Sequence, residues 1–310
     1  MGERKVSPEE LRRSITKPVC FLCLLDVAIK TIDLSTPDEE KKFKAIKRVL
    51  AILHDRFDEM VMDRPAWIAT ELYWEIADVT GNPDPYKVLK EESNRMGMAV
   101  AAKVEEDVFS EKDVYKRLYK AVAAAITGNV IDYGSALHKF DLNQLTGIYK
   151  EILERGFAVN DLSLLLKKIK ESRIVLYIGD NAGETAFDRI LVRFLVEMGL
   201  KVYYAAKDAP ISNDATVEDA RYVGIDKYAE IISTGNNILG VDFRRMSRKF
   251  IEVYRSCDFV IAKGQSNYET FTHFIGRLEK PVFLILRVKC PPIAEHIGLS
   301  VGDNVVLKIQ

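Results

Sequence analysis

The 310-residue sequence has few of the residues that crosslink a chain or bind soft metals, because it contains only four cysteines and four histidines. So few cysteines in a chain of this length exclude a disulfide scaffold and indicate a reduced, cytoplasmic protein. An excess of one charge is also lacking, since 45 lysines and arginines balance 46 aspartates and glutamates, for a formal net charge of -1. That balance argues against a protein that recruits nucleic acid or an anionic membrane through a basic surface.

Long hydrophobic runs are absent as well. No apolar run approaches the ~20 residues that a membrane-spanning helix needs, and the N-terminal M-G-E-R-K-V-S-P-E-E is charged where a secretory signal has an apolar core. We therefore expect no membrane partner. The hydrophobic fraction of 48% is nevertheless enough to bury the core of one large domain or of two ordinary ones.

The first half of the chain has the pattern of helices. The segments S-P-E-E (7–10) and T-P-D-E (36–39) each combine an N-capping residue, a proline in the first turn and acidic residues. Segments such as Lys41–Met62 and Tyr86–Val104 space their apolar residues three and four apart, and no alternating strand pattern appears before residue 173. We therefore predict a helical bundle region over residues 1–172.

From residue 173 the pattern changes to short apolar strands, most of them separated by helical segments. The predicted strands are Ile174–Ile178, Lys201–Ala206, Glu230–Ser233, Asp258–Ala262, Pro281–Leu286 and Asn304–Ile309. Such alternation favours a mostly parallel sheet covered by helices on both faces. The prediction is an α/β protein in which an all-helical N-terminal region precedes a Rossmann-like domain over residues 173–310.

The most informative stretch is Arg173–Arg189, which reads R-I-V-L-Y-I-G-D-N-A-G-E-T-A-F-D-R. A buried strand is followed by a tight polar loop and then by a helix, and in open α/β sheets ligands bind at such junctions. Asp180 and Asn181 offer hard oxygen donors suited to Mg²⁺ or Mn²⁺. One such residue is equally well explained as a helix cap, but two together after a buried strand favour a metal site.

Polar loops also follow the other strands, and they read K-D-A-P-I-S-N-D, T-G-N-N, K-G-Q-S-N and R-V-K-C. Because the carboxyl ends of parallel strands share one edge, we expect these groups to converge on an active-site rim. Asp214, if it is more than a helix cap, would complete an oxygen triad with Asp180 and Asn181. Positive charge for holding a phosphoryl group would come from Lys263, Arg287 and Lys289.

Two features of the helical half have a weaker link to this edge. Asn129 and Asp132 follow an alanine-rich helix in a glycine-bracketed turn, from which their side chains would reach across to the site. Cys20 and Cys23 lie three residues apart, on one helical face. No second close cysteine pair exists, so buried core residues explain these two thiols better than a zinc or redox site does.

A dinucleotide or S-adenosylmethionine binder is the main alternative, because it uses the same strand-loop-helix geometry. The loop G-D-N-A-G-E lacks the G-x-G-x-x-G fingerprint and places an aspartate where a pyrophosphate needs bare backbone. Asp208, after the second strand, would still be able to mimic the ribose-binding acid. A non-catalytic helical adaptor is a third class, and it would not require polar loops after five strands.

These motifs resemble the DUF89 family of metal-dependent damage-control phosphatases, especially its archaeal-type branch. The resemblance spans most of the chain, and it is carried by Y-I-G-D-N-A-G-E-T-A-F-D-R, P-I-S-N-D-A-T-V-E-D-A, I-S-T-G, A-K-G-Q-S-N-Y-E-T, L-R-V-K-C, C-F-L-C and G-N-V-I-D-Y-G. It implies a phosphoric monoester hydrolase acting on small metabolites such as sugar phosphates or phosphorylated cofactor precursors and their damaged forms. A carboxyl methyltransferase role is also attached to eukaryotic relatives, and the missing glycine fingerprint gives it no support here.

The resemblance also implies roles for individual residues. The expected ligands of a divalent metal (Mg²⁺ or Mn²⁺, with Co²⁺ and Ni²⁺ as further candidates) are Asp180, Asn181 and Asp214. The expected catalytic residues are Asp180, Lys263 and Lys289, and the expected substrate-binding residues are Asn129, Asp132, Glu184, Gly264, Asn267 and Arg287. Attack by water at the metal and attack by Asp180 through an aspartyl-phosphate use the same residues, and both stay open. The segment Q-S-N-Y-E (265–269) departs from the D-L-N-Y-R of eukaryotic members, which argues against their acidic sugar-phosphate pocket.

Overall fold

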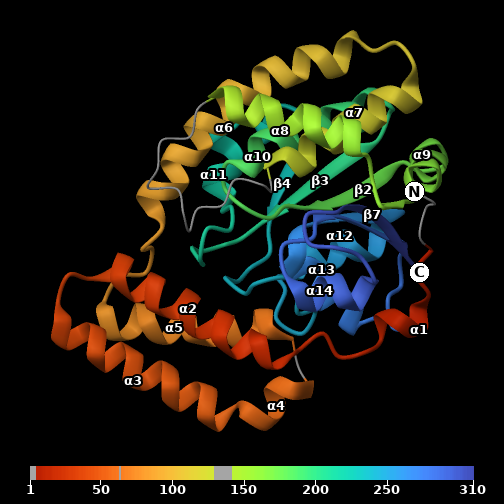
Figure 1. Ribbon diagram of the computed structural model, residues 1–310. Coiled ribbons are helices and arrows are strands. Elements are labelled where there is room, and N and C mark those ends of the chain that lie inside the picture. The colour runs from red at the N-terminus through yellow and green to blue at the C-terminus, as the bar shows by residue number, and fades with distance from the viewer. Residues whose placement is uncertain (1–4, 63, 129–141) are drawn as a thin grey trace.

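A seven-stranded sheet forms the centre of the protein (Figure 1), whose computed structural model describes residues 5–62, 64–128 and 142–310. The strand order is β1-β7-β6-β5-β2-β3-β4, and every neighbouring pair is parallel except β6 and β7. The strands are β1 (Val159–Asn160), β2 (Ile174–Ile178), β3 (Lys201–Ala206), β4 (Glu230–Ser233), β5 (Phe259–Lys263), β6 (Val282–Arg287) and β7 (Asn304–Ile309). The chain runs outward from β2 through β3 and β4 and then returns to β5 on the other side of β2. The topological switch point, where open sheets bind ligands, is therefore between β2 and β5.

Helices cover both faces of the sheet because successive strand residues point to opposite sides. In β2, Val175 and Tyr177 join one buried apolar cluster, whereas Leu176 and Ile178 join another. The first cluster includes α6 (Lys87–Ser110), α7 (Val114–Gly128), α8 (Leu142–Arg155), α9 (Leu162–Lys170), α10 (Glu184–Glu197) and α11 (Val217–Tyr222). The second includes α1 (Pro8–Leu11), α12 (Arg248–Ser256), α13 (Gly264–His273) and α14 (Pro291–Ile297).

The helices α2 (Pro18–Ser35), α3 (Glu39–Asp55), α4 (Phe57–Met62) and α5 (Pro65–Thr80) form a separate bundle, which we call the helical lobe (Figure 1). Its apolar core contains residues such as Ile32, Val49 and Ile76. Two residues of the sheet's loops, Ile211 and Leu239, are buried in the same core. The helical lobe is therefore docked on the loops that follow β3 and β4.

The structure confirms the predicted fold class, a mostly parallel sheet surrounded by helices, and the six predicted strands are present. It adds β1, a two-residue strand that lies before residue 173 and pairs with β7. Such a short strand has no periodicity that the sequence could reveal. The helices α6 and α7 also precede residue 173, yet they pack against α10 of the sheet-containing part. The division into a region over 1–172 and a domain over 173–310 stays a prediction. In the described part of the chain, no helix combines the length and apolar character needed to cross a membrane.

Gly97 allows α6 to lie against the loop before α10, and a Cβ at this position would overlap the carbonyl oxygen of Gly183. We expect Gly97→Ala to lower the free energy of unfolding by about 1–3 kcal/mol, the usual cost of overpacking. Gly147 on α8 is exposed and has no atom within 4 Å of such a Cβ, so Gly147→Ala should raise it by about 0.5–1 kcal/mol. Chemical denaturation measures both changes, and an unaffected Gly97→Ala variant would contradict the close packing.

Candidate active site

Asp180 and Asn181 follow β2 directly, at the switch point. The backbone N–H of Ala215 donates to the carbonyl oxygen of Asp180 at 2.8 Å, and Asn181 forms an isolated antiparallel bridge with Asp214. Backbone hydrogen bonds thus bring the loop after β3 back to the loop after β2. The three side chains predicted as metal ligands lie together for this reason.

Lys263, the last residue of β5, has a fully buried side chain. Its ammonium group donates to the carbonyl oxygen of Ala125 at 2.8 Å, to Asp188 Oδ1 at 3.0 Å and to Glu184 Oε1. This placement differs from the predicted contact with the substrate, because three protein oxygens from α7 and α10 surround the ammonium group. The burial of Lys263 depends on helices far away in the sequence.

Glu184, the first residue of α10, connects this buried lysine to Asn181. The amide Nδ2 of Asn181 donates to Glu184 Oε2 at 3.2 Å and to Asp180 Oδ2 at 3.0 Å. Because two carboxylates hold the NH₂ group, the amide presents its oxygen Oδ1 rather than its nitrogen to a cation. Asn181 is therefore oriented as a metal ligand would be.

Carboxylates are more numerous than ammonium groups among the buried side chains of this junction. They include Asp180, Glu184, Asp188 and Asp214, with the ammonium groups of Lys207 and Lys263, all at most 8% exposed. With all four carboxylates ionised, they outnumber these two ammonium groups by two formal charges, which is the charge of one divalent cation. Burial and then the neighbouring Glu184 and Asp214 raise the pKa of Asp180, and burial raises the pKa of Asp214 to about 6.

The donor set fits a hard cation. In the described part of the chain, no group of three or more His, Cys, Asp or Glu side chains is arranged to hold a metal. The junction instead offers two carboxylates and one amide oxygen, which suits Mg²⁺ or Mn²⁺ with water in the remaining positions. A soft metal such as Zn²⁺ would prefer sulfur or imidazole ligands.

Lys207, which follows β3, is a residue of this site that the sequence reasoning missed. Its ammonium group lies 3.6 Å from Asp214 Oδ2 and donates to the carbonyl oxygens of Gly240, at 3.0 Å, and Ile238. Burial lowers the pKa of Lys207, while the charges of Asp214 and Asp180 oppose that change. The sequence does contain a signal for this residue, because Lys207 stands directly after a predicted strand and directly before Asp208.

Gly264 and Asn267 lie at the start of α13 and join it to the end of β2. Gly264 has a φ of +81°, and a Cβ there would overlap the carboxylate of Asp180, so only glycine fits without a shift. The amide of Asn267 donates to the carbonyl oxygens of Gly179 at 3.2 Å and Lys263 at 2.7 Å. Its own Oδ1 is buried and has no hydrogen-bond partner among the described residues.

The two cations predicted at the end of β6 lie in different surroundings. Lys289 is exposed, and its charge, like that of Lys263, opposes the burial that raises the pKa of Asp180. Its backbone N–H donates to Gln265 Oε1 at 2.5 Å. Arg287 is turned toward α8, where Nη2 donates to Glu151 Oε1 at 3.2 Å. Lys289 is thus the predicted lysine that remains at the surface near Asp180.

The remaining predicted residues lie elsewhere or outside the described part of the chain. Asn129 and Asp132 fall between residues 129 and 141, which the structure does not describe. Cys20 is buried in α2 as expected for a core residue, whereas Cys23 is exposed. All four cysteines are free thiols.

Comparison with known proteins identifies the family. The profile of the damage-control phosphatase ARMT1-like domain matches residues 16–305. The chain belongs to this family. The ARMT1-like chain is 36% identical over 294 residues to the uncharacterized protein MJ0202 of Methanocaldococcus jannaschii, covering 94% of this chain and 95% of that protein. It is 32% identical over 295 residues to the damage-control phosphatase PH1575 of Pyrococcus horikoshii, covering 93% and 96%.

A solved structure agrees with this assignment. The crystal structure of PH1575, a DUF89 family protein, superposes on the ARMT1-like chain with a TM-score of 0.85 at 30% sequence identity. The match covers 95% of this chain and 99% of the other. The resemblance to DUF89 that the motifs indicated is confirmed.

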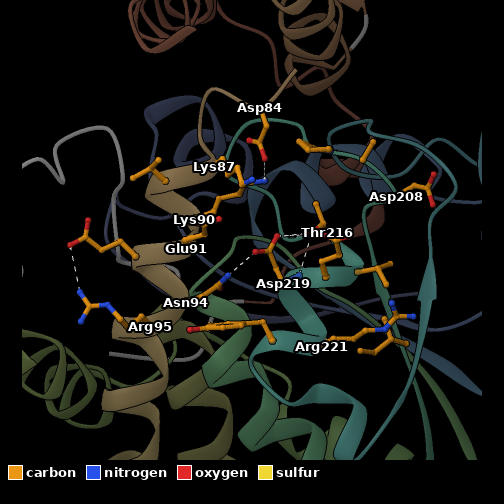
Figure 2. Close-up of a pocket in the computed structure, with 18 of the residues that line it drawn as sticks. Asp84, Lys87, Lys90, Glu91, Asn94, Arg95, Asp208, Thr216, Asp219 and Arg221 are labelled. Atoms are coloured by element: carbon orange, nitrogen blue, oxygen red, sulfur yellow. Dashed lines mark hydrogen bonds and ion pairs between the residues drawn. The ribbon is translucent and has the colours of Figure 1, made fainter. Parts of the chain in front are cut away.

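The ARMT1-like chain has a cavity of about 1090 Å³ between α6 and α11. Figure 2 shows Asn94 of α6 reaching across to Asp219 of α11, and Nδ2 donates to Oδ1 at 2.6 Å. The side-chain oxygen of Asn94 accepts from the N–H of Gly183 at 2.6 Å. Asn94 therefore connects the wall of the cavity to the loop that carries Asp180 and Asn181. The predicted metal ligands Asp180, Asn181 and Asp214 do not line the cavity.

Removal of the buried Lys263 charge should destabilise the ARMT1-like fold. Lys263→Met leaves Glu184 and Asp188 buried without their cation, and we expect the free energy of unfolding to fall by about 3–5 kcal/mol. The exposed ion pair of Lys249 with Glu230 provides the control, and Lys249→Met should cost about 0–1 kcal/mol. Chemical denaturation in metal-free buffer measures the free energy of unfolding of both variants. Equal losses would show that the charge of Lys263 does not stabilise the buried Glu184 and Asp188.

Glu269 on α13 should make stability depend on pH. Its Oε2 accepts from the N–H of Ala66, in the first turn of α5, at 3.0 Å, and burial raises its pKa from 4.5 to about 7. Because the folded state binds this proton more tightly than the unfolded state, stability should fall as pH rises from 4.5 to 7 and level off above. Compared with Glu269→Gln, the wild-type protein should lose roughly 3 kcal/mol across this window, since one pKa unit corresponds to about 1.4 kcal/mol. Urea titrations across the window test this, and parallel pH profiles would contradict the raised pKa.

Proposed function

We propose that this ARMT1-like protein is a metal-dependent phosphatase that hydrolyses small phosphate monoesters in the cytoplasm, such as sugar phosphates or phosphorylated cofactor precursors. The observation that carries the proposal is the buried cluster in which four carboxylates exceed two ammonium groups at the β2–β5 switch point. A small phosphorylated metabolite is the expected partner. The names of the P. horikoshii and Archaeoglobus fulgidus relatives, both damage-control phosphatases, support the reaction class.

In this proposal Asp180, Asn181 and Asp214 hold the divalent metal, with Mg²⁺ or Mn²⁺ as first candidates and Co²⁺ or Ni²⁺ as further ones. The oriented amide of Asn181 and the concentration of buried carboxylates at this junction support these ligands. When bound, the metal supplies Lewis-acid polarisation of a phosphate oxygen. Glu184 acts indirectly, since it fixes the amide of Asn181.

The two lysines have different proposed roles. Lys289 is exposed near Asp180 and would neutralise the negative charge that builds up on the phosphoryl oxygens. Lys263 is enclosed by protein oxygens and acts as a positioning residue through Glu184. Gly264 lets the carboxylate of Asp180 lie against the start of α13, while Asn267 ties α13 to the end of β2.

Hydrolysis breaks the bond between phosphorus and the leaving-group oxygen, transfers a water oxygen to phosphorus and returns a proton to the leaving group. Asp180 would serve this reaction in one of two ways: as the nucleophile of an aspartyl-phosphate, or as a group that holds the attacking water. Both routes need its carboxylate at the β2–β5 junction. Substrate contacts by Asn129, Asp132 and Arg287 stay predictions.

The alternative, an S-adenosylmethionine-dependent carboxyl methyltransferase or a nucleotide-binding protein, has less support. Asp180 is only 8% exposed and lies at the junction where a dinucleotide would bring its phosphates. A buried carboxylate there would repel them. Asp208 is the residue that this alternative would need most, because it would bind a ribose.

Hydrolysis of a generic aryl phosphate by chelator-stripped protein, with one divalent metal added back at a time, tests the proposal. We expect at least one metal to restore turnover. In Asp180→Ala the turnover rate should fall by more than the roughly 10–100-fold that the substitution of an outer-shell residue costs. Asp208→Ala is the matched control, because it also removes an aspartate after a strand and should retain activity.

Turnover that persists without metal, or that Asp180→Ala retains in full, would sink the proposal. In that case, calorimetric titration with S-adenosylmethionine and with nucleotides decides whether the alternative holds. A binding signal that Asp208→Ala abolishes would establish it.

A further inference from the structure

The loop between β3 and α11, which carries Asp214, contains an unusual backbone conformation. Ser212, two residues before Asp214, has a φ of +47°. In this left-handed region the Cβ of any residue other than glycine crowds the backbone, so the conformation persists only where surrounding contacts enforce it. Contacts from the helical lobe and from the loop itself surround Ser212.

The helical lobe provides the first contact. The hydroxyl of Tyr73, on α5, donates to Ser212 Oγ at 2.9 Å, and Ser212 Oγ donates to Asn213 Oδ1 at 3.2 Å. The carbonyl oxygen of Asn213 accepts from the N–H of Ala182 at 2.9 Å. The hydroxyl of Tyr73 is therefore connected to the backbone that pairs the two metal-site loops.

The same helix holds the loop at a second point. Trp74 Nε1 donates to Asn237 Oδ1 at 3.0 Å, and Asn237 Nδ2 donates to the carbonyl oxygen of Pro210 at 3.2 Å. Ile211, between these contacts, is 3% exposed and buried in the core of the helical lobe. Apolar burial and hydrogen bonds from α5 thus constrain residues 210–213, immediately before Asp214.

We propose that Tyr73, assisted by Trp74, is a positioning residue for the metal ligand Asp214. The helical lobe holds Ser212 in its left-handed conformation, and this conformation sets the direction in which the chain enters Asp214 and the bridge to Asn181. The lobe contributes no ligand in this scheme, yet the metal site depends on its docking. The inference rests on the proposed function, because it requires Asp214 to bind the metal.

Metal affinity, measured by titrating Mn²⁺ into the chelator-stripped full-length protein in a calorimeter, tests this role without any turnover. Tyr73→Phe removes only the hydroxyl, and we expect it to weaken Mn²⁺ binding roughly tenfold, the scale of outer-shell substitutions. Ser212→Gly in the Tyr73→Phe background should restore most of the affinity, since glycine adopts a φ of +47° without strain. A structural role unrelated to Ser212 would not be rescued in this way.

Tyr149→Phe is the matched control. Its hydroxyl donates to Asp107 Oδ2 at 2.8 Å, and Tyr149 is 4% exposed on α8. The control variant should bind Mn²⁺ as tightly as the wild type does. Weaker binding in Tyr73→Phe alone would then come from the lost contact with Ser212 and not from the loss of a tyrosine hydroxyl in general. Thermal unfolding of each variant verifies that the protein titrated is folded.

The outcomes distinguish this inference from the proposed function. Wild-type protein that binds no Mn²⁺, or an Asp214→Ala variant that binds it unchanged, would overturn this inference, while aryl phosphate turnover restored by any divalent metal would leave the phosphatase proposal standing. If binding depends on Asp214 but Tyr73→Phe binds as tightly as wild type, only the positioning role is overturned. Weakened binding that Ser212→Gly leaves unrestored would also overturn it, because Tyr73 would then act by another route.

Discussion

The constraint on which the rest of the structure depends is the burial of four carboxylates at one sheet junction. An ionised carboxylate taken out of water needs an opposite charge or several hydrogen bonds close by. The protein supplies Lys207 on one side and Lys263 on the other, and two buried tyrosine hydroxyls, from Tyr177 and Tyr204, donate to Asp188 at 2.6 and 3.0 Å. In the proposed function, a divalent cation held by Asp180, Asn181 and Asp214 would further stabilise the ionised carboxylates.

Close packing makes this burial possible. Cβ atoms at Gly97 and Gly128 would overlap the loop before α10 and the backbone of Glu184, so α6 and α7 approach that loop and the start of α10 more closely than larger residues allow. The side chains of the cluster are buried as a result, and burial strengthens the electrostatic interactions among them. The helical lobe and the α6–α11 cavity both border the loop after β3, which links the proposed metal site to elements distant in the sequence.

The fold was predictable because its signals are local. The apolar run of β2, the polar turn after it and the amphipathic pattern of α10 lie within twenty-five consecutive residues, 173–197, and each is set by backbone sterics and solvent exposure. The convergence of Asp180, Asn181 and Asp214 followed from the rule that parallel strands end at one edge. The short β1 and the antiparallel β7 pairing lacked such signals, because they depend on contacts between distant segments.

The sequence by itself determined the order of the strands along the chain, the type of sheet and the oxygen donors at its edge, since these depend on residue type and short spacing. Only the tertiary structure decided which partners the charged ends of the long side chains contact. Lys263 is buried because oxygens of Ala125, Glu184 and Asp188 surround its ammonium group, whereas Lys289 remains exposed. Lys207 lies beside Asp214, and Tyr73 contacts Ser212, for the same reason. A flexible or aromatic side chain reaches the partner that the folded chain brings near, and packing between distant helices and loops sets that partner.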